Sequence, residues 1–345
     1  MRGTIGRKVT WLITCVYLTC FLGPARMVQA HDAKNEPSFK HLNKVIDKLE
    51  RGLLVAGLYV NSLDPTNAVG LVNSNGWQAG DEVYTKPAID FLFIEQEYEP
   101  FEMERLRNFL LALNSKREVF LKGNLQPNLI PIVNLPTTGF DEFHTVIKQV
   151  LDLGVFGVWL SRVQNAGEAK KFVQACRYAQ AAGSPIYEPR GTRSFFPFWA
   201  SYLWGLTQEE YLQRADPWPL NPHGELMLVL HIEDKEGVEN IDSILDVPGF
   251  AGVTFGPLDY SFTIGRPADK HHPQVTEAER KVKDSCKRHG IHFIEWVDET
   301  DVKQRLDEGY KILVIGSDTN NDFYGGARYG NRGAGKVLDY LRQRK

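Results

Sequence analysis

Short apolar runs that alternate with amphipathic segments are the feature that most constrains the fold of this chain. The runs are rich in β-branched residues, as expected for strands of a parallel sheet that is buried on both faces. Between the runs, apolar residues recur at helical spacing; Phe143, Ile147 and Val150, for example, fall on one helix face. The eight runs are Leu54–Val60, Asp90–Gln96, Ile130–Leu135, Gly157–Val163, Leu226–Glu233, Gly252–Asp259, His292–Val297 and Lys311–Asp318.

Eight strands that alternate with helices predict an α/β fold of the (β/α)8 or TIM-barrel type. An open, doubly wound sheet is the alternative. Such a sheet usually carries a glycine-rich GxGxxG loop after its first strand, and none follows Leu54–Val60. The barrel is therefore favoured, and we expect a leading helix over Phe39–Leu53 to close its bottom.

The chain from residue 31 to residue 345 is expected to form a single barrel domain with two insertions. The insertions, at about 61–88 and 184–225, exceed the usual length of loops between strands and helices. The second is rich in aromatic residues and proline. Two interpretations stay open for it: a surface subdomain that packs on itself, and a lid or oligomer contact, since clustered aromatic residues mark interfaces.

Residues 1–30 have the pattern of a secretory signal peptide. Arg2 and Lys8 give a basic start, the apolar run Trp11–Leu22 follows, and small residues precede a cleavage point near Ala30. This run is shorter than the roughly 20 residues that span a bilayer. We expect an exported protein, periplasmic or secreted; an N-terminal anchor that is never cleaved is the alternative.

The charge balance of the chain argues against a nucleic-acid partner. The formal net charge is −3, and removal of the basic signal peptide would make the protein more acidic. No later segment is apolar enough for a membrane span. Cys176 and Cys286 occupy apolar positions of expected helices, which favours buried thiols over a disulfide.

Carboxylates gather at the predicted strand ends, where TIM barrels place their catalytic groups. Glu95 and Glu97 end the second run, Glu233 the fifth and Asp259 the sixth. Crowded carboxylates are unfavourable unless a cation neutralises them, and ligands that are all oxygen favour Mg²⁺ or Mn²⁺. Because the fifth and sixth strands are neighbours, Glu233 and Asp259 are expected to share one ion. Loop caps or arginine pairs are the alternative roles for these carboxylates.

Several motifs, in order and spacing, resemble the HpcH/HpaI aldolase and citrate lyase family. They are "VLDLGVFGVWL", "YEPRGTRS", "HIEDKEGVENIDSILDVPG", "GVTFGPLDYSFTIG", "HHPQV" and "LVIGSD". The resemblance spans roughly Leu54 to Ala327 and implies a phosphoenolpyruvate/pyruvate-type TIM barrel. It also implies a homo-oligomer and aldolase activity on a 2-oxo acid.

The resemblance implies roles for residues on the fifth and sixth strands. Glu233 and Asp259 match the two protein ligands of a divalent metal that stabilises the enolate of pyruvate. His231 stands where the family usually has a glutamine that contacts substrate. The backbone amides of Leu258 and Asp259 match those that hold the pyruvate carboxylate.

Other positions match the family only in part. Asp152 matches an acidic residue that assists the base, and Arg193 matches a substrate-binding arginine, although Ser194 replaces the glycine that follows it. Tyr98 stands in place of the histidine that moves the proton, and Asn134 in place of the arginine that polarises the keto oxygen. Because tyrosine has an ordinary pKa near 10, its use as a base at neutral pH requires a nearby metal or cation.

Three functional hypotheses follow from these departures. In the first, the protein is a metal-dependent carbon–carbon lyase whose acid/base lies within Glu95–Tyr98, with Tyr98 or Glu97 moving the proton and Arg162 supplying the missing charge. In the second, it runs another metal-enolate reaction of the citrate lyase type. In the third, it is an exported protein that binds a 2-oxo acid and catalyses nothing.

Overall fold

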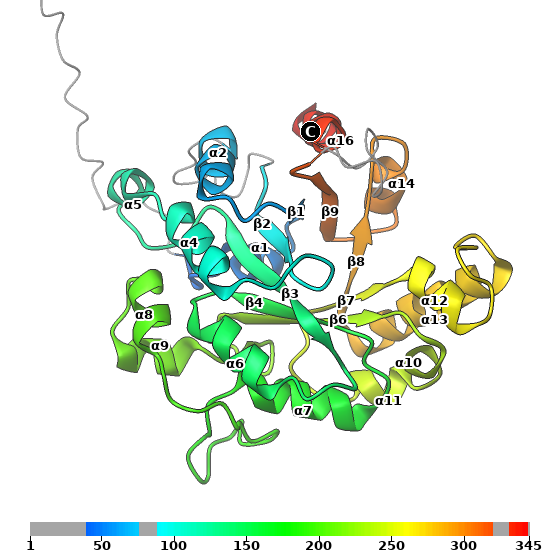
Figure 1. The fold of residues 1–345 in the computed structure, drawn as a ribbon, viewed down its shortest axis with the longest axis horizontal. Helices are drawn as coiled ribbons and strands as arrows, with labels where there is room; N and C mark the ends of the chain where they lie inside the picture. The colour runs from blue at the N-terminus through cyan, green and yellow to red at the C-terminus, as the bar shows by residue number, and fades with distance from the viewer. Residues whose placement is uncertain (1–38, 76–87, 320–330, 344–345) are drawn as a thin grey trace, which may run out of the picture.

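The computed structural model of the protein describes residues 39–75, 88–319 and 331–343. Its centre is a closed ring of eight parallel strands surrounded by helices (Figure 1), and the ring closes through pairing of β1 with β9 and of β4 with β6. A ninth, two-residue strand, β5 (Pro217–Trp218), pairs only with β6. The predicted (β/α)8 barrel is confirmed, and the open doubly wound alternative is wrong. The barrel strands are β1 (Val55–Val60), β2 (Phe91–Glu95), β3 (Ile130–Thr138), β4 (Gly157–Ser161), β6 (Leu226–Ile232), β7 (Gly252–Phe255), β8 (His292–Trp296) and β9 (Ile312–Ser317).

The sixth predicted strand is shorter than expected. Strand β7 ends at Phe255, and Pro257 begins helix α12 (Pro257–Thr263). Proline suits the first turn of a helix because it has no backbone N–H to satisfy there. Asp259 therefore projects from a helix that starts at the C-terminal end of the barrel, which we call the mouth.

Local sequence chemistry accounts for helix ends around the barrel. The Asn165 side chain accepts a hydrogen bond from the backbone N–H of Glu168 and so caps α7, and Gly290 ends α13 in the left-handed conformation at φ 68°. The remaining helices are α1 (Lys44–Glu50), α2 (Pro65–Asn75), α4 (Met103–Leu113), α5 (Lys116–Lys122), α6 (His144–Asp152), α7 (Ala166–Cys176), α8 (Phe198–Trp204), α9 (Gln208–Arg214), α10 (Lys235–Glu239), α11 (Ile241–Leu245), α13 (Pro273–His289), α14 (Val302–Asp307) and α16 (Asn331–Gln343).

Helix α1 closes the N-terminal end of the barrel, which we call the floor, as the sequence predicts. The Asn43 side chain donates to the backbone oxygen of Glu225, which precedes β6, at 3.0 Å. The Lys48 ammonium donates to Asp90, which precedes β2, at 2.8 Å. These bonds tie the helix to segments that enter different strands, so α1 is part of the barrel and not an appendage.

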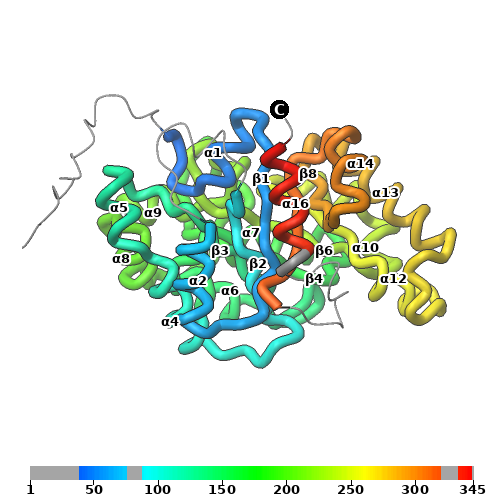
Figure 2. The backbone as a smooth tube through the Cα atoms, turned by 90° about the horizontal axis from the view of Figure 1, so that it is seen from above, coloured from blue at the N-terminus to red at the C-terminus, as the bar shows by residue number. Residues whose placement is uncertain are grey.

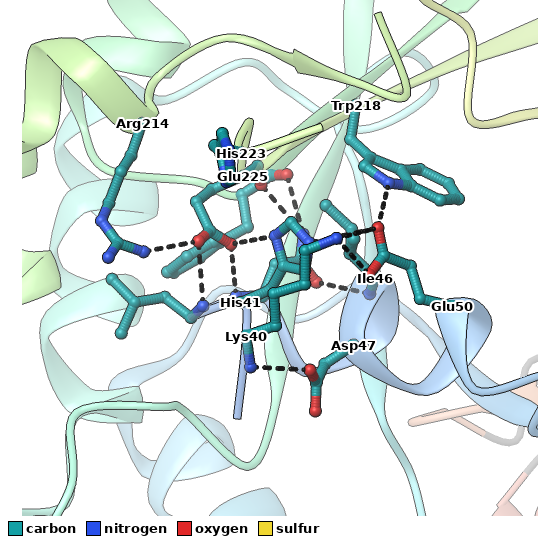
Figure 3. A network of polar contacts seen from close by, with 12 residues as sticks. Lys40, His41, Ile46, Asp47, Glu50, Arg214, Trp218, His223 and Glu225 are labelled. Carbon is teal, nitrogen blue, oxygen red and sulfur yellow. Dashed lines mark hydrogen bonds and ion pairs between the residues drawn. The ribbon is translucent and has the colours of Figure 1, made fainter. Parts of the chain in front are cut away.

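Figure 3 shows a buried histidine at the centre of the floor. His41 Nε2 lies 3.4 Å from a carboxylate oxygen of Glu50, and Nδ1 lies 3.6 Å from one of Glu225. Burial lowers the pKa of His41, but the nearby carboxylates of Glu225 and Glu50 raise it above the ordinary value. Arg214 also donates to Glu225, at 3.0 Å, and Trp218 donates to Glu50, at 3.2 Å.

The aromatic insertion at 184–225 attaches on the floor side of the barrel. Trp204 stacks on Phe156 with ring centroids 4.2 Å apart and donates its indole N–H to the backbone oxygen of Gly154 at 2.9 Å. Both partners precede β4, so the described residues of this insertion do not form a lid over the mouth of their own chain. Its exposed aromatic side chains are Phe195, Phe196, Phe198 and Tyr202.

Helix α7 ends at Cys176, because Arg177 adopts an extended conformation. The Arg177 guanidinium is fully buried and donates to Asp216 of the insertion at 2.7 Å. Cys176 and Cys286 are free and buried, as predicted.

Helix α16, at the C-terminal end of the described chain, packs against the outside of the barrel. A Cβ atom on Gly316 of β9 would lie 2.7 Å from the side chain of Ala334, so α16 packs closely on that strand. Figure 2 shows α16 beside β1, the strand that pairs with β9.

No helix within the described residues is long and apolar enough to cross a bilayer. The predicted signal peptide at 1–30 lies outside the described residues, as do residues 76–87 of the first insertion.

Candidate active site

A cavity of about 530 Å³ opens at the mouth of the barrel. Six residues that the sequence singled out line it: Glu95, Tyr98, Asn134, His231, Leu258 and Asp259. They come from the ends of β2, β3 and β6 and from the first turn of α12, so the fold gathers side chains that lie far apart in the sequence.

Glu233 lies directly behind the cavity wall. It follows the last residue of β6 and is 1% exposed, and both of its carboxylate oxygens are buried without a hydrogen-bond partner among the described residues. His231 Nε2 lies 3.4 Å from one of these oxygens. Burial lowers the pKa of His231, so this histidine is neutral at pH 7 and leaves the carboxylate without a compensating charge.

Glu233 is a buried acid whose negative charge, when ionised, is not compensated by its surroundings. Burial, and next the charge of Asp259, raise the pKa of Glu233 to about 8. Gly256 lies against the carboxylate, because a Cβ at this position would be 2.7 Å from Glu233 Oε2 and 2.8 Å from His231 Nε2. Only glycine leaves this space open, and an unpaired buried carboxylate is costly.

Glu233 and Asp259 have the donor chemistry of divalent-cation ligands. Their donor atoms are all oxygen, which suits Mg²⁺ or Mn²⁺, and neither Glu233 nor Asp259 forms an ion pair with a described lysine or arginine. Within the described residues no group of three His, Cys, Asp or Glu side chains forms a complete metal site.

The backbone N–H groups of Leu258 and Asp259 lie where the predicted carboxylate-binding role requires them, at the cavity. Leu258 and Asp259 lie in the first turn of α12, where N–H groups have no carbonyl partner inside the helix. Both residues line the cavity, and the side chain of Leu258 is 43% exposed. These N–H groups are thus available to an anion in the mouth.

Glu95 positions the turn that follows β2. Its carboxylate accepts hydrogen bonds from the Tyr59 hydroxyl at 2.8 Å, from the backbone N–H of Tyr98 at 3.0 Å and from the Asn134 amide at 3.0 Å. A carboxylate with this many donors is held in place, so the geometry favours a positioning role over proton transfer.

Glu97 is not among the residues that line the cavity, but its pKa is that of a neutral-pH acid/base. Its Oε2 accepts from the Ser161 hydroxyl at 2.6 Å and from the Asn134 amide at 3.1 Å. Burial is the main cause that raises the pKa of Glu97 to about 7, and the nearby charge of Glu233 raises it further. The pKa of a general base works best near the operating pH.

Tyr98 is a poor base in this setting. Burial, and then the charges of Glu233, Glu97 and Asp259, raise its pKa above the ordinary value. The sequence argument required a cation to lower this pKa, whereas the surrounding protein groups raise it. The phenol lines the cavity and is 54% exposed, so it remains able to donate a hydrogen bond to a ligand.

Arg162 lies near the site but does not line the cavity. Its backbone is in the left-handed region at φ 58°, and its Nε lies 4.0 Å from Asp234. The guanidinium stacks 5.4 Å from the centroid of the Phe140 ring. Its charge lowers the pKa of Glu233, although burial and Asp259 outweigh it.

The chain does not bring Asp152 and Arg193 to its own mouth. Asp152 ends α6 on the floor side of β4, where Arg193 donates to it at 2.8 Å and Lys148 at 2.6 Å. The Arg193 guanidinium also lies 4.5 Å from the centroid of the Tyr178 ring. Neither residue lines the cavity, so within one chain they form a buried structural pair.

Three residues of the site were not assigned roles from sequence: Tyr59, Ser161 and Gly256. Tyr59 and Ser161 sit close to the C-terminal ends of β1 and β4, where a polar side chain in an apolar run is the available signal. Their partners are 36 and 64 residues away in sequence. The pairing therefore depends on barrel register, which the sequence pattern does not specify.

Comparison with known proteins places this geometry in a family. The family model for HpcH/HpaI aldolase/citrate lyase matches residues 128–322. A hydroxypyruvate/pyruvate aldolase from Roseobacter denitrificans is 26% identical over 251 residues, covering 70% of this chain and 85% of the relative. A 4-hydroxy-2-oxo-heptane-1,7-dioate aldolase from Shigella flexneri is 28% identical over 242 residues, covering 69% and 78%.

Solved structures agree on the fold. A protein of the HpcH/HpaI aldolase/citrate lyase family from Burkholderia cenocepacia superposes with a TM-score of 0.63 at 20% identity, covering 87% of this chain and all of that one. Macrophomate synthase superposes with a TM-score of 0.57 at 20% identity, covering 91% and 93%. The names of the family and of its relatives indicate an aldolase-like lyase. Because the family model matches more than half of its length, the chain belongs to the HpcH/HpaI aldolase/citrate lyase family.

Proposed function

We propose that the protein is a divalent-metal-dependent aldolase that breaks or forms the carbon–carbon bond next to pyruvate in a 4-hydroxy-2-oxo acid. The observation that carries this proposal is Glu233. A fully buried carboxyl group whose two oxygens have no hydrogen-bond partner among the described residues, beside Asp259 at the mouth of an aldolase-family barrel, would be stabilised in its ionised form by a cation.

Glu233 and Asp259 would hold the ion. A bound Mg²⁺ or Mn²⁺ supplies a Lewis acid that withdraws electron density from the keto oxygen of a 2-oxo acid. The backbone N–H groups of Leu258 and Asp259 bind the carboxylate of that acid and orient it in the cavity. Neutral His231, whose Nδ1 is buried without a partner among the described residues, offers a further polar contact.

Glu97 moves the proton in this mechanism. During cleavage its carboxylate accepts the proton of the 4-hydroxyl group while the bond between C3 and C4 breaks, and an aldehyde leaves. The electron pair of that bond stays on C3 as the enolate of pyruvate, and C3 then takes a proton back. Ser161 and Asn134 orient the Glu97 carboxylate, and no oxidant or reductant is needed.

The experiment that tests this function is exchange of the methyl protons of pyruvate with solvent deuterium, followed by NMR. We expect exchange that depends on added Mg²⁺ or Mn²⁺ and that Glu233→Gln abolishes. Glu236→Gln, at an exposed position on α10, is the matched control and leaves the rate unchanged. Absence of exchange in the unaltered protein with either metal would reject the proposal.

A non-catalytic 2-oxo acid-binding protein is the second candidate. Asn134 offers no positive charge at the position of the family arginine, and Tyr98 is no base at neutral pH, which favours binding over turnover. Tight pyruvate binding by calorimetry with no deuterium exchange would support this candidate against the aldolase.

We also propose that the protein acts outside the cytoplasm as a homo-oligomer. The signal-peptide pattern of residues 1–30 supports export, and the exposed aromatic side chains of the 184–225 insertion would supply a contact. The secreted protein should begin near His31 by N-terminal sequencing, and light scattering should give a mass above that of one chain.

A further inference from the structure

His231 and Glu233, at the end of β6, bring a nitrogen and an oxygen atom close together at the mouth. His231 lines the cavity, and its Nε2 lies 3.4 Å from Oε2 of Glu233. This approach is not a hydrogen bond, because Glu233 Oε2 has no hydrogen-bond partner among the described residues. The two atoms are therefore neighbours that do not bond to each other.

The separation of these two atoms is that of two ligands of one ion. Nitrogen and oxygen ligands lie about 2.1 Å from Zn²⁺ or Mg²⁺ in proteins. Two atoms at this distance from a common ion are about 3.0 Å apart at a right angle and about 3.4 Å apart at the tetrahedral angle. The 3.4 Å between His231 Nε2 and Glu233 Oε2 is therefore compatible with shared coordination.

Gly256 leaves open a space that both atoms border. Its backbone N–H donates to the backbone oxygen of Ile232 at 2.9 Å, which holds the end of β7 beside the end of β6. A Cβ added to Gly256 would lie 2.7 Å from Glu233 Oε2 and 2.8 Å from His231 Nε2. One point beside Gly256 is thus almost equally distant from the two atoms, and a cation there could approach both.

The ring of His231 is held in its orientation by the barrel interior. Trp159 of β4 meets it edge to face, with ring centroids 6.3 Å apart and an interplanar angle of 85°. Nδ1 is buried without a hydrogen-bond partner among the described residues, so Nε2 is the ring nitrogen that lies beside Glu233. A ligand atom that is already positioned loses little conformational freedom when an ion binds.

An imidazole at this position changes the donor atoms that the proposed ion would meet. The family resemblance puts a glutamine, with a neutral amide oxygen, where this chain has His231. Carboxylate and amide oxygens suit Mg²⁺ or Mn²⁺, whereas imidazole nitrogen adds affinity for the later transition metals, such as Co²⁺ and Zn²⁺. His231 would therefore shift the metal preference of the site away from Mg²⁺.

We propose that His231 is a third protein ligand of the divalent ion, through Nε2, beside Glu233 and Asp259. This inference rests on the proposed metal-dependent function and adds a ligand to the site. His231 and Asp259 line the same cavity, but within the described residues the three side chains are not already gathered around one point. Ion binding would therefore move the Asp259 carboxylate toward the other two side chains.

Electron spin echo envelope modulation of bound Mn²⁺ tests the ligand directly and does not depend on turnover. We expect modulation from a coordinated nitrogen in the unaltered protein, and we expect it to change to the ¹⁵N pattern when the histidines are labelled with ¹⁵N. Bound Mn²⁺ with no modulation from a histidine nitrogen overturns the inference. This measurement needs no variant, so it holds even where a substitution prevents folding.

Variants assign the nitrogen to one histidine. His231→Gln should remove the modulation and lower the ratio of Co²⁺ to Mg²⁺ affinity, measured by calorimetry, about 10–100-fold, because changing even a partner of a metal ligand has an effect of this size. His271→Gln, at another histidine that lines the cavity, is the matched control and leaves both unchanged. Modulation that persists in His231→Gln, or that His271→Gln removes, overturns the inference.

The deuterium-exchange assay separates failure of this inference from failure of the proposed function. Metal-dependent exchange without histidine modulation rejects His231 as a ligand and leaves the aldolase proposal in place. Histidine modulation without exchange supports the ligand and rejects the aldolase. Calorimetry that finds no binding of Mn²⁺, Co²⁺ or Zn²⁺ overturns the inference together with the metal dependence of the proposed function.

Discussion

At the scale of single residues, the site depends on how burial changes the chemistry of carboxylates. Glu95, Glu97 and Glu233 have the same functional group, but Glu95 is held by donors, Glu97 has a pKa near neutrality, and Glu233 lacks partners among the described residues. These differences support the roles that we propose for them: positioning for Glu95, proton transfer for Glu97 and cation binding for Glu233.

The role of Glu97 gives a prediction about rate and pH. Glu97→Gln should lower kcat for aldol cleavage about 10²–10⁴-fold, because the glutamine amide cannot accept the proton. Since the pKa of Glu97 is about 7, the rate of the unaltered protein should rise with pH up to about 7 and level above it. Steady-state kinetics between pH 5 and pH 9 would check this.

Tyr98→Phe should keep turnover within a few-fold, and Glu99→Gln serves as a control in the same turn. Loss of turnover in Tyr98→Phe together with retained turnover in Glu97→Gln would transfer the acid/base role to the phenol.

Glu233 gives a second prediction, about stability without metal. Its pKa is about 8 in the folded protein and near 4.5 in the unfolded chain, so the folded state holds the proton more tightly. The stabilisation is complete below pH 4.5 and is lost as pH rises through 8, at no more than ~1.4 kcal/mol per pH unit. Urea unfolding with a chelator, between pH 5 and 8, should show this decline.

Glu233→Gln should flatten that decline, and added Mg²⁺ should oppose it in the unaltered protein by binding the ionised carboxylate. An unfolding free energy of Glu233→Gln that falls as steeply as that of the unaltered protein would show that another group is responsible.

Some residues of this site could be predicted from the sequence, and others could not, for physical reasons. Glu233 was predictable because a charged residue that ends an apolar strand of a barrel must reach the mouth. The bond between Tyr59 and Glu95 was not, because it depends on which side chains of β1 and β2 face each other. Asp152 came from family resemblance alone, and in this fold it lies at the floor.

At the scale of secondary-structure elements, the positions of the strand ends determine which side chains and backbone amides lie at the cavity. All eight predicted strands formed because an apolar run buried on both faces has few other conformations. Their ends were less predictable: the run Gly252–Asp259 divides at Gly256, where Pro257 starts a helix. That division places the backbone amides of α12 in the mouth.

Gly256 gives an element-scale prediction. A methyl group at this position would lie 2.6 Å from Glu233 Cβ, so Gly256→Ala must displace the end of β6 or the start of α12. We expect Mn²⁺ affinity to fall about tenfold, or ~1.4 kcal/mol, by electron paramagnetic resonance of the free ion.

Gly70→Ala is the control for this substitution. Gly70 lies in α2, where a methyl group added to its Cα would meet no heavy atom within 4 Å, so alanine should leave metal affinity unchanged. The same change should stabilise the helix by about 0.5–1 kcal/mol. Equal Mn²⁺ affinity in Gly256→Ala and the unaltered protein would contradict the assigned role of Gly256.

At the scale of the whole molecule, the two ends of the barrel differ in whether their buried carboxylates have partners. At the floor, buried carboxylates such as Asp90 and Glu225 have cationic partners and backbone donors. At the mouth, Glu233 has neither among the described residues. The floor therefore stabilises the fold, and the mouth retains an electrostatic cost that a cation would relieve.

Glu225 gives the prediction for the floor. Its carboxylate accepts from the backbone N–H groups of Leu42 and Asn43, at 3.0 and 2.8 Å, and from Arg214. Glu225→Gln should lower the free energy of unfolding by ~3 kcal/mol, because it breaks a buried charged network. Glu209→Gln, at an exposed position on α9, should change it by less than ~0.5 kcal/mol in the same denaturation experiment.

The attachment of α1 at the floor has a consequence for how the molecule would sit if it were tethered. The described chain starts beside this helix. Any leader kept on the protein, or any tag fused there, is therefore attached to the end of the barrel opposite the cavity. A molecule attached to a membrane or a bead through its N-terminus would be held from the end of the barrel that does not carry the cavity.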